Sequence, residues 1–139
     1  MGAVIIGIEG THLQAHERAQ ICQPACAGVI LFSRNYAAPD QLHQLCAAIR
    51  AARPDLLLCV DHEGGRVQRF RDGFTAIPAA AAFGRCFDRR PLLACRLAEA
   101  AGVVIACELR QYGIDFSLTP DLDLAAPVST VIGERAYHT

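Results

Sequence analysis

The chain has 139 residues, of which 53% are hydrophobic, and this is the size and composition of one globular domain. Thirteen basic and fourteen acidic residues give a net charge of −1, so the charge does not predict binding to nucleic acid or to an anionic membrane. Residues 1–10 lack the basic start of a signal peptide, and no apolar run approaches the roughly 18 residues of a membrane span. We therefore expect a cytoplasmic protein.

Four apolar runs along the chain predict β-strands. They are Val4–Ile8, Gly28–Phe32, Leu56–Val60 and Ile114–Leu118. The first three are short and almost continuously apolar, which is typical of buried parallel strands, whereas the fourth alternates between apolar and polar residues. The segment that follows the fourth run, residues 119–139, is expected to be a loop.

Helical patterns lie between these strands. Thr11 and Gln14 have the spacing of a capping box and predict a helix that ends near Cys22. A second helix is expected from Pro39, because an apolar stripe follows it at helical spacing on one face. This stripe consists of Leu42, Leu45, Cys46 and Ile49. A third helix is expected over residues 91–112, and because it is apolar on most sides we expect it to be well buried.

The alternation of strands and helices predicts one α/β domain over residues 1–139 with a parallel sheet and right-handed crossovers. Two architectures share this pattern. A doubly wound sheet fits the length. A (β/α)8 barrel of the TIM type needs about 200 residues or more, so four strands would form its N-terminal half. Composition and periodicity do not separate these alternatives.

The cysteines are expected to be free thiols, mostly buried among apolar residues. There are seven, an odd number, and no C-x-x-C pair occurs. Cys22 and Cys26 are not followed by a matching pair of Cys or His residues, which argues against a zinc site. We expect no metal and no cofactor.

Polar residues follow each predicted strand. They are Glu9, Arg34, Asn35, Asp61, Glu63, Asp121 and Asp123. Because the carboxyl ends of parallel strands share one face in both architectures, a ligand is expected there. Hydrogen-bonding side chains at every strand end indicate a ligand with many hydroxyl or amide groups, such as a sugar. Asp121 and Asp123 either face this site or cap turns in their loop.

The richest stretch is residues 60–70, where two acids, two glycines and two arginines follow the third strand. Asp61 is expected to point into the ligand face, and His62 to point away from it and pack in the interior. A charged turn with a solvated Arg–Asp pair is the structural alternative. A metal held by Asp61 and Glu63 is another, although two carboxylates are a weak ligand set. Glycosidases use paired carboxylates, and Asp61 with Asp121 or Asp123 would be such a pair.

Four segments of the chain resemble the bacterial β-N-acetylhexosaminidases of glycoside hydrolase family 3, of the cytoplasmic peptidoglycan-recycling type. The segments are Gly28–Tyr36, Val60–Thr75, Gly113–Ser117 and Val131–Tyr137. The resemblance implies a (β/α)8-type barrel that removes terminal N-acetylglucosamine from muropeptide-derived sugars, with retention, without a cofactor and as a monomer. It also implies that Asp61, Arg69 and Arg135 bind the substrate.

The chain departs from the family pattern in three ways. His62 stands where the family usually has Gln, and Asp121 replaces an apolar residue. The family's K-H-F-P-G-H-G segment, its Asp/His acid–base pair and its nucleophilic Asp do not occur before Thr139. The resemblance therefore implies a half barrel with an uncovered edge and core face, inactive alone, with no catalytic residue in this chain. A non-catalytic sugar-binding module and an interaction fragment without a ligand are the alternatives.

Overall fold

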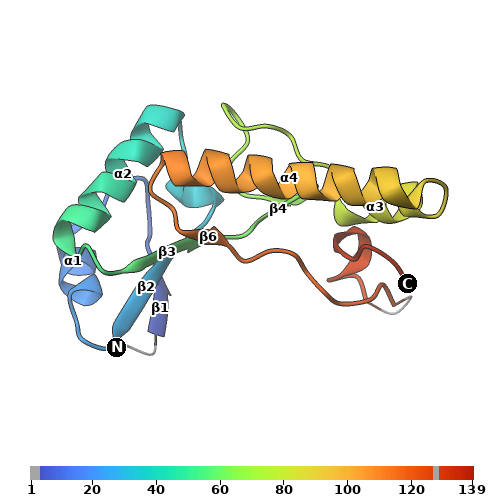
Figure 1. The fold of residues 1–139 in the computed structure, drawn as a ribbon. Helices are drawn as coiled ribbons and strands as arrows, with labels where there is room; N and C mark the ends of the chain where they lie inside the picture. The colour runs from blue at the N-terminus through green and yellow to red at the C-terminus, as the bar shows by residue number, and fades with distance from the viewer. Residues whose placement is uncertain (1–3, 127–128) are drawn as a thin grey trace.

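The structure, a computed structural model, describes residues 4–126 and 129–139 and contains a four-stranded parallel sheet (Figure 1). Its strands are β1 (Val4–Gly7), β2 (Cys26–Leu31), β3 (Leu57–Val60) and β6 (Phe116–Ser117). They lie in the order β1-β2-β3-β6, and each neighbouring pair is parallel. The four strands and the parallel sheet predicted from the sequence are confirmed, although β6 is shorter than expected.

Three helices cover one face of this sheet. They are α1 (Ala15–Ile21), α2 (Pro39–Ala52) and α4 (Pro91–Gln111). Side chains from all three, including Ile21, Leu45 and Leu109, form a single buried cluster with Val29 and Leu58 of the central strands. A doubly wound sheet reverses its strand order and has helices on both faces, whereas here the order advances in one direction. The arrangement is therefore that of a barrel segment.

The start of α1 differs from the prediction. The helix begins at Ala15, and its capping box is formed by Gln14 and Glu17 rather than by Thr11 and Gln14. Glu17 is buried, and its carboxylate accepts the backbone N–H groups of Glu9 at 2.7 Å and Gln14 at 2.8 Å. A carboxylate that satisfies two backbone donors fixes the helix entry better than the Thr11 hydroxyl can.

Helix α4 is largely exposed, so the prediction of a well-buried helix is wrong. Its buried residues are Ala94, Ile105 and Leu109, whereas Leu92 is 80% exposed and Val103 is 57% exposed. The helix packs on the sheet with its C-terminal half and on α3 (Ala80–Phe87) with its N-terminal half (Figure 1). No helix among the described residues is both long enough and apolar enough to span a membrane.

Five short elements were not predicted. They are α3, the antiparallel hairpin β4 (His62–Gly64) and β5 (Val67–Gln68), and the 3-10 turns η1 (Ser33–Asn35) and η2 (Gly133–Arg135). Gly84 lets the C-terminal segment approach α3 closely, because a Cβ atom there would lie 1.6 Å from the Tyr137 carbonyl oxygen. This contact anchors the segment that carries η2 against the helices.

Among the described residues, the second face of the sheet is apolar and partly exposed. In the strand register Ile5 lies beside Gly28 and Leu57, while Phe116 lies beside Cys59. Because neighbouring residues of a strand point to opposite faces, these side chains point away from the helical layer. Ile5 is 42% exposed, Leu57 45% and Phe116 37%. The uncovered core face expected of half a barrel is therefore present.

The cysteines are all free, but fewer are buried than predicted. Cys26, Cys46 and Cys59 are buried, whereas Cys22, Cys95 and Cys107 are exposed and Cys86 is half-buried. Burial raises the pKa of Cys46 to about 12 and that of Cys59 to about 11. The buried thiols therefore stay protonated and act as small apolar side chains.

Candidate functional site

Asp61 and Arg69 meet at the carboxyl end of the sheet. Asp61 directly follows β3, and Arg69 returns to it just after the hairpin, so that its Nη2 donates to Asp61 Oδ2 at 2.9 Å. The two side chains are 22% and 29% exposed, which leaves them accessible to a ligand. The Arg69 guanidinium lies 5.9 Å from the centre of the Phe32 ring. Its Nε is buried and has no hydrogen-bond partner among the described residues.

Gln68 holds the loop that presents Arg69. Its side-chain amide donates to the carbonyl oxygens of Phe70 at 3.2 Å and Thr75 at 2.9 Å, and its oxygen accepts the backbone N–H of Ile77 at 3.0 Å. Gln68 is buried, so these bonds are protected from water. A buried amide that joins three points of one loop turns an irregular segment into a rigid support.

His62 packs in the interior as predicted. It is fully buried, with its ring centroid 5.7 Å from that of Phe70 and 5.4 Å from that of Phe74. Neither ring nitrogen has a hydrogen-bond partner among the described residues. Desolvation lowers the pKa of His62 to about 4, with a smaller opposing effect of Glu108 and a further lowering by Arg71. The ring is therefore neutral at pH 7 and does not reach the ligand face.

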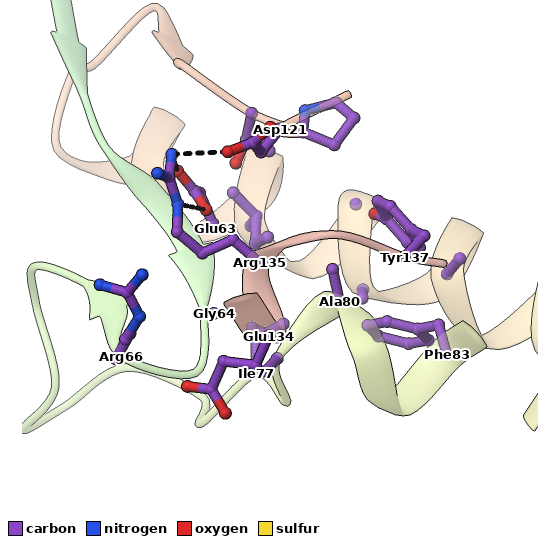
Figure 2. A pocket seen from close by; sticks show the side chains of 17 residues that line it. Glu63, Gly64, Arg66, Ile77, Ala80, Phe83, Asp121, Glu134, Arg135 and Tyr137 are labelled. Carbon is purple, nitrogen blue, oxygen red and sulfur yellow. Dashed lines mark hydrogen bonds and ion pairs between the residues drawn. The ribbon is translucent and has the colours of Figure 1, made fainter. Parts of the chain in front are cut away.

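Arg135 lies in η2 and is held by two carboxylates from other parts of the chain (Figure 2). Its Nε and Nη2 donate to the two oxygens of Glu63 at 2.9 and 2.7 Å, and Nη2 lies 3.0 Å from Asp121 Oδ2. The hydrogen bonds to Glu63, with the charges of Glu63, Asp121 and Asp61, raise the pKa of Arg135 above its ordinary value despite partial burial. Arg135 is thus a fixed cation near Asp61.

A cavity of about 250 Å³ opens beside this cluster. Its polar lining includes Glu63, Asp121 and Arg135, and α4 contributes the small residues Ala101 and Gly102. The rest of its wall includes Ile77, Phe83, Ile105 and Tyr137. Asp61 and Arg69 do not line this cavity. Of the three residues that the family resemblance implicates in binding, Asp61 and Arg69 therefore lie at the open strand end, and Arg135 lies at the edge of the cavity.

The neighbouring strand ends contribute support rather than further free polar groups. Asn35 is fully buried, and its amide donates to the carbonyl oxygens of Ile8 at 3.1 Å and Gly10 at 2.8 Å. Arg34 Nε also donates to the Ile8 carbonyl, at 2.9 Å, and its guanidinium lies 4.5 Å from the centre of the Phe32 ring. These bonds fix the loop after β1 to the loop after β2.

Several other polar residues of the sequence do not join the site. Arg66 donates to the Val131 carbonyl and Arg71 to the Gly65 carbonyl at 2.7 Å, so neither returns to the acids. Asp123 is exposed. The carboxylates of Asp61, Glu63 and Asp121 are each paired with an arginine.

One other group of side chains has ligand atoms close together. Atoms of Glu9, His16 and Glu17 lie within 4.8 Å of one another. Both oxygens of Glu17, however, already accept backbone N–H groups of the α1 cap. This group is therefore explained by the helix start.

The comparisons with known proteins decide the family. Residues 3–139 match the glycosyl hydrolase family 3 N terminal domain. The chain belongs to glycosyl hydrolase family 3. A β-hexosaminidase from Alkalilimnicola ehrlichii is 50% identical over 140 residues, covering 100% of this chain and 40% of the relative. One from Methylococcus capsulatus is 53% identical over 128 residues, covering 92% and 37%.

Solved structures of this family have the same fold. Native NagZ from Neisseria gonorrhoeae superposes with a TM-score of 0.94 at 43% identity, over 99% of this chain and 40% of that chain. A family 3 β-N-acetylglucosaminidase from Paenibacillus sp. superposes with a TM-score of 0.85 at 33% identity, over 96% and 25%. The family 3 chain described here therefore spans about 40% of the length of the curated relatives that it matches.

Sequence reasoning from local patterns missed the contact between Glu63 and Arg135. The two residues are 72 positions apart, and only the family resemblance drew attention to Arg135. Sequence reasoning also left the role of Asp121 open. The structure places the Asp121 side chain, which is 7% exposed, against Arg135. Short-range spacing does not reveal such contacts, because residues far along the chain, Asp121 and Arg135, return to the hairpin residue Glu63.

Proposed function

We propose that this chain is the sugar-binding N-terminal part of a retaining β-N-acetylhexosaminidase. The substrate would be terminal N-acetylglucosamine of muropeptides from peptidoglycan, hydrolysed in the cytoplasm during cell-wall recycling. Relatives named β-hexosaminidase and a gonococcal NagZ in complex with N-trifluoroacetyl-D-glucosamine support this proposal. The observation that carries it is the Asp61–Arg69 pair beside Arg135 at the carboxyl end of the sheet.

Each of the three residues has a chemical role in this proposal. Asp61 accepts hydrogen bonds from sugar hydroxyl groups, while Arg69 and Arg135 donate to sugar oxygens. Hydrogen bonds to charged groups are stronger than those between neutral groups, and all three side chains are held by partners before a ligand arrives. The sugar ring is thereby oriented at the strand ends, as in other barrel enzymes.

The catalytic groups belong outside residues 1–139 in this proposal. Asp61 is paired with Arg69 and acts in binding, whereas Asp121 is paired with Arg135 and does not itself contact the sugar. The nucleophilic Asp and the acid–base His would come from the remainder of the barrel, which would also cover the exposed face with Ile5, Leu57 and Phe116. The complete enzyme would be a monomer without a metal or cofactor.

Binding of N-acetylglucosamine tests the proposal. Titration calorimetry or NMR should detect the sugar on the 139-residue chain, and Asp61→Asn and Arg69→Ala should each weaken binding at least tenfold, about 1.4 kcal/mol. The matched control is Asp55→Asn, which removes an exposed carboxylate at the opposite end of β3. No sugar binding by the folded chain, or equal binding by all variants, would refute this assignment.

Activity separates a glycosidase from a non-catalytic sugar-binding module. The chain alone should not cleave a chromogenic β-N-acetylglucosaminide. Addition of the region of the Alkalilimnicola relative that lies outside the match should restore cleavage, and Arg69→Ala should abolish it. Sugar binding without restored cleavage would favour the binding module. Cleavage by the chain alone that is lost in Asp61→Ala or Asp123→Ala would restore the two-carboxylate hypothesis.

A further inference from the structure

The donors of Arg135 show which edge of its guanidinium is available. The side chain has five N–H groups. The Nε–H group donates to Glu63 Oε2 at 2.9 Å and Nη2 donates to Glu63 Oε1 at 2.7 Å, while Nη2 also lies 3.0 Å from Asp121 Oδ2 in an ion pair. The Nε–Nη2 edge is therefore engaged. Among the described residues, no hydrogen-bond partner is found for the two N–H groups of Nη1.

The two carboxylates that engage Arg135 are themselves fixed. Glu63 is part of β4, and its side chain is 11% exposed. Asp121 is 7% exposed, and its second oxygen accepts the backbone N–H of Asp123 at 2.9 Å. The guanidinium is thus held from two separate segments. Such support fixes its plane and leaves the Nη1 edge as the part that can contact a ligand.

The charges around this edge do not balance. Glu63 and Asp121 bring two negative charges to one guanidinium, so the group of three carries a net charge of −1. Asp61 and Arg69 form an ion pair, and Glu134 and Arg66 bring one charge of each sign to the cavity wall. Arg34 packs on the ring of Phe32, 4.5 Å from its centre.

A negative surrounding has a consequence for ligand choice. A neutral hydroxyl or carbonyl oxygen can accept a hydrogen bond from one Nη1 hydrogen without charge repulsion. A carboxylate or phosphate in the same place meets the attraction of one cation and the repulsion of two anions. At about 6 Å and an effective dielectric constant near 20–40, one such repulsion changes an affinity about tenfold or more. Asp121 supplies the unbalanced charge, because Glu63 alone would neutralise Arg135.

We propose that Asp121, together with Glu63, positions Arg135 to bind a neutral oxygen of the sugar, and that its charge makes this subsite reject anionic sugars. Asp121 is a positioning residue that acts through Arg135. This inference rests on the proposed function, and it deepens it by naming the class of sugar that the site selects: neutral amino sugars rather than sugars with an acidic substituent.

The test compares neutral and anionic sugars on charge variants. Affinities of N-acetylglucosamine, N-acetylmuramic acid and N-acetylglucosamine 6-phosphate are measured on the chain and on Asp121→Asn, which keeps the shape and one oxygen but removes the charge. We expect the affinity ratio of at least one anionic sugar to the neutral sugar to rise about tenfold. Neutral binding should change less than threefold, and Asp121→Glu should restore the original ratio.

The matched control is Asp123→Asn, which removes an exposed charge two residues away and should leave the ratio unchanged. A structural role for Asp121 would lower the melting temperature and weaken all three sugars equally, and this result would overturn the proposal. An unchanged ratio in Asp121→Asn, with N-acetylglucosamine still bound, would refute the proposal and leave the proposed function intact. Loss of every sugar from the unaltered chain would refute both.

Discussion

Acidification should destabilise the protein through His62, and the size of the effect follows from its burial. The ring is fully buried without a hydrogen-bond partner among the described residues, and desolvation lowers its pKa from 6.5 to about 4. Between these values the unfolded chain binds the proton and the folded chain does not. The stability that depends on a neutral His62 is therefore complete above pH 6.5 and is lost as the pH falls towards 4.

The magnitude can be worked out from the two pKa values. The full difference corresponds to about 3 kcal/mol. The loss due to His62 is about 1 kcal/mol at pH 5.5 and about 2–3 kcal/mol at pH 4.5. This loss is a large part of the free energy of unfolding of a small domain, which is roughly 5–15 kcal/mol.

Urea denaturation at pH 7.5, 6.5, 5.5 and 4.5 measures this loss. Carboxylates also titrate near pH 4.5. The contribution of His62 is therefore measured as the difference in free energy of unfolding between the unaltered chain and His62→Gln, which cannot gain a proton at this position. That variant should be less stable at pH 7.5 but should lose about 2–3 kcal/mol less on acidification to pH 4.5. His43→Gln, at an exposed position of α2, serves as the control and should follow the unaltered chain. Parallel curves for the unaltered chain and His62→Gln would refute the reasoning.

Three further predictions concern stability. In urea denaturation, Gly65→Ala should lower the free energy of unfolding by about 3 kcal/mol, because φ is +54° and the new Cβ atom would lie 2.7 Å from another side chain. Gly113→Ala, with φ of +76° and no atom within 4 Å of the new Cβ atom, should lower it by about 1 kcal/mol. Gln68→Leu should cost about 3 kcal/mol in the same assay, since three hydrogen bonds of a buried amide are lost. The hydrogen bond that His138 donates to the Asp88 carboxylate raises the pKa of His138. The stability from this exposed pair is therefore complete below pH 6.5 and is lost as the pH rises through the raised pKa. An Asp88→Asn variant whose melting temperature falls equally at pH 5.5 and pH 8.5 would contradict this.

The periodicity of apolar residues predicted the helical and sheet layers of this fold well, because a helix that packs on a sheet must have apolar residues on one face. The stripe on α2, from Leu42 to Ile49, is buried as expected, and Pro39 begins the helix. The barrel and the doubly wound sheet could not be separated, since both require the same alternation of elements. Strand order separates them, and order depends on contacts between residues far apart in the chain.

Elements without a strong local pattern could not be predicted. The strand β4 contains His62, Glu63 and Gly64, which have neither apolar alternation nor β-branched side chains. Helix α3 has a moderate apolar face but no polar N-cap. The exposure of α4 could not be predicted from the sequence either. An apolar helix surface shows that the helix can be buried, but it does not show whether other residues of this chain cover that surface.

The candidate site was predictable where its residues are close in sequence. Asp61 and Arg69 are eight positions apart, and a short hairpin brings them together. The contacts of Arg135 with Glu63 and Asp121 depend on the path of the loop after β6, which has no periodicity to indicate it. Asp121 therefore remained undecided between the site and a loop turn until the structure placed it, and it serves both.

The strand order has a consequence for how the molecule opens. Strands β2 and β3 each have a hydrogen-bonded neighbour on both sides, whereas β1 and β6 have one. Amide hydrogens of the central pair should therefore exchange with solvent most slowly, and those of β1 and of the two-residue β6 much sooner. The sheet would then come apart from its two margins inward, and Asp61, which follows β3, would keep its place after the outer strands have begun to open.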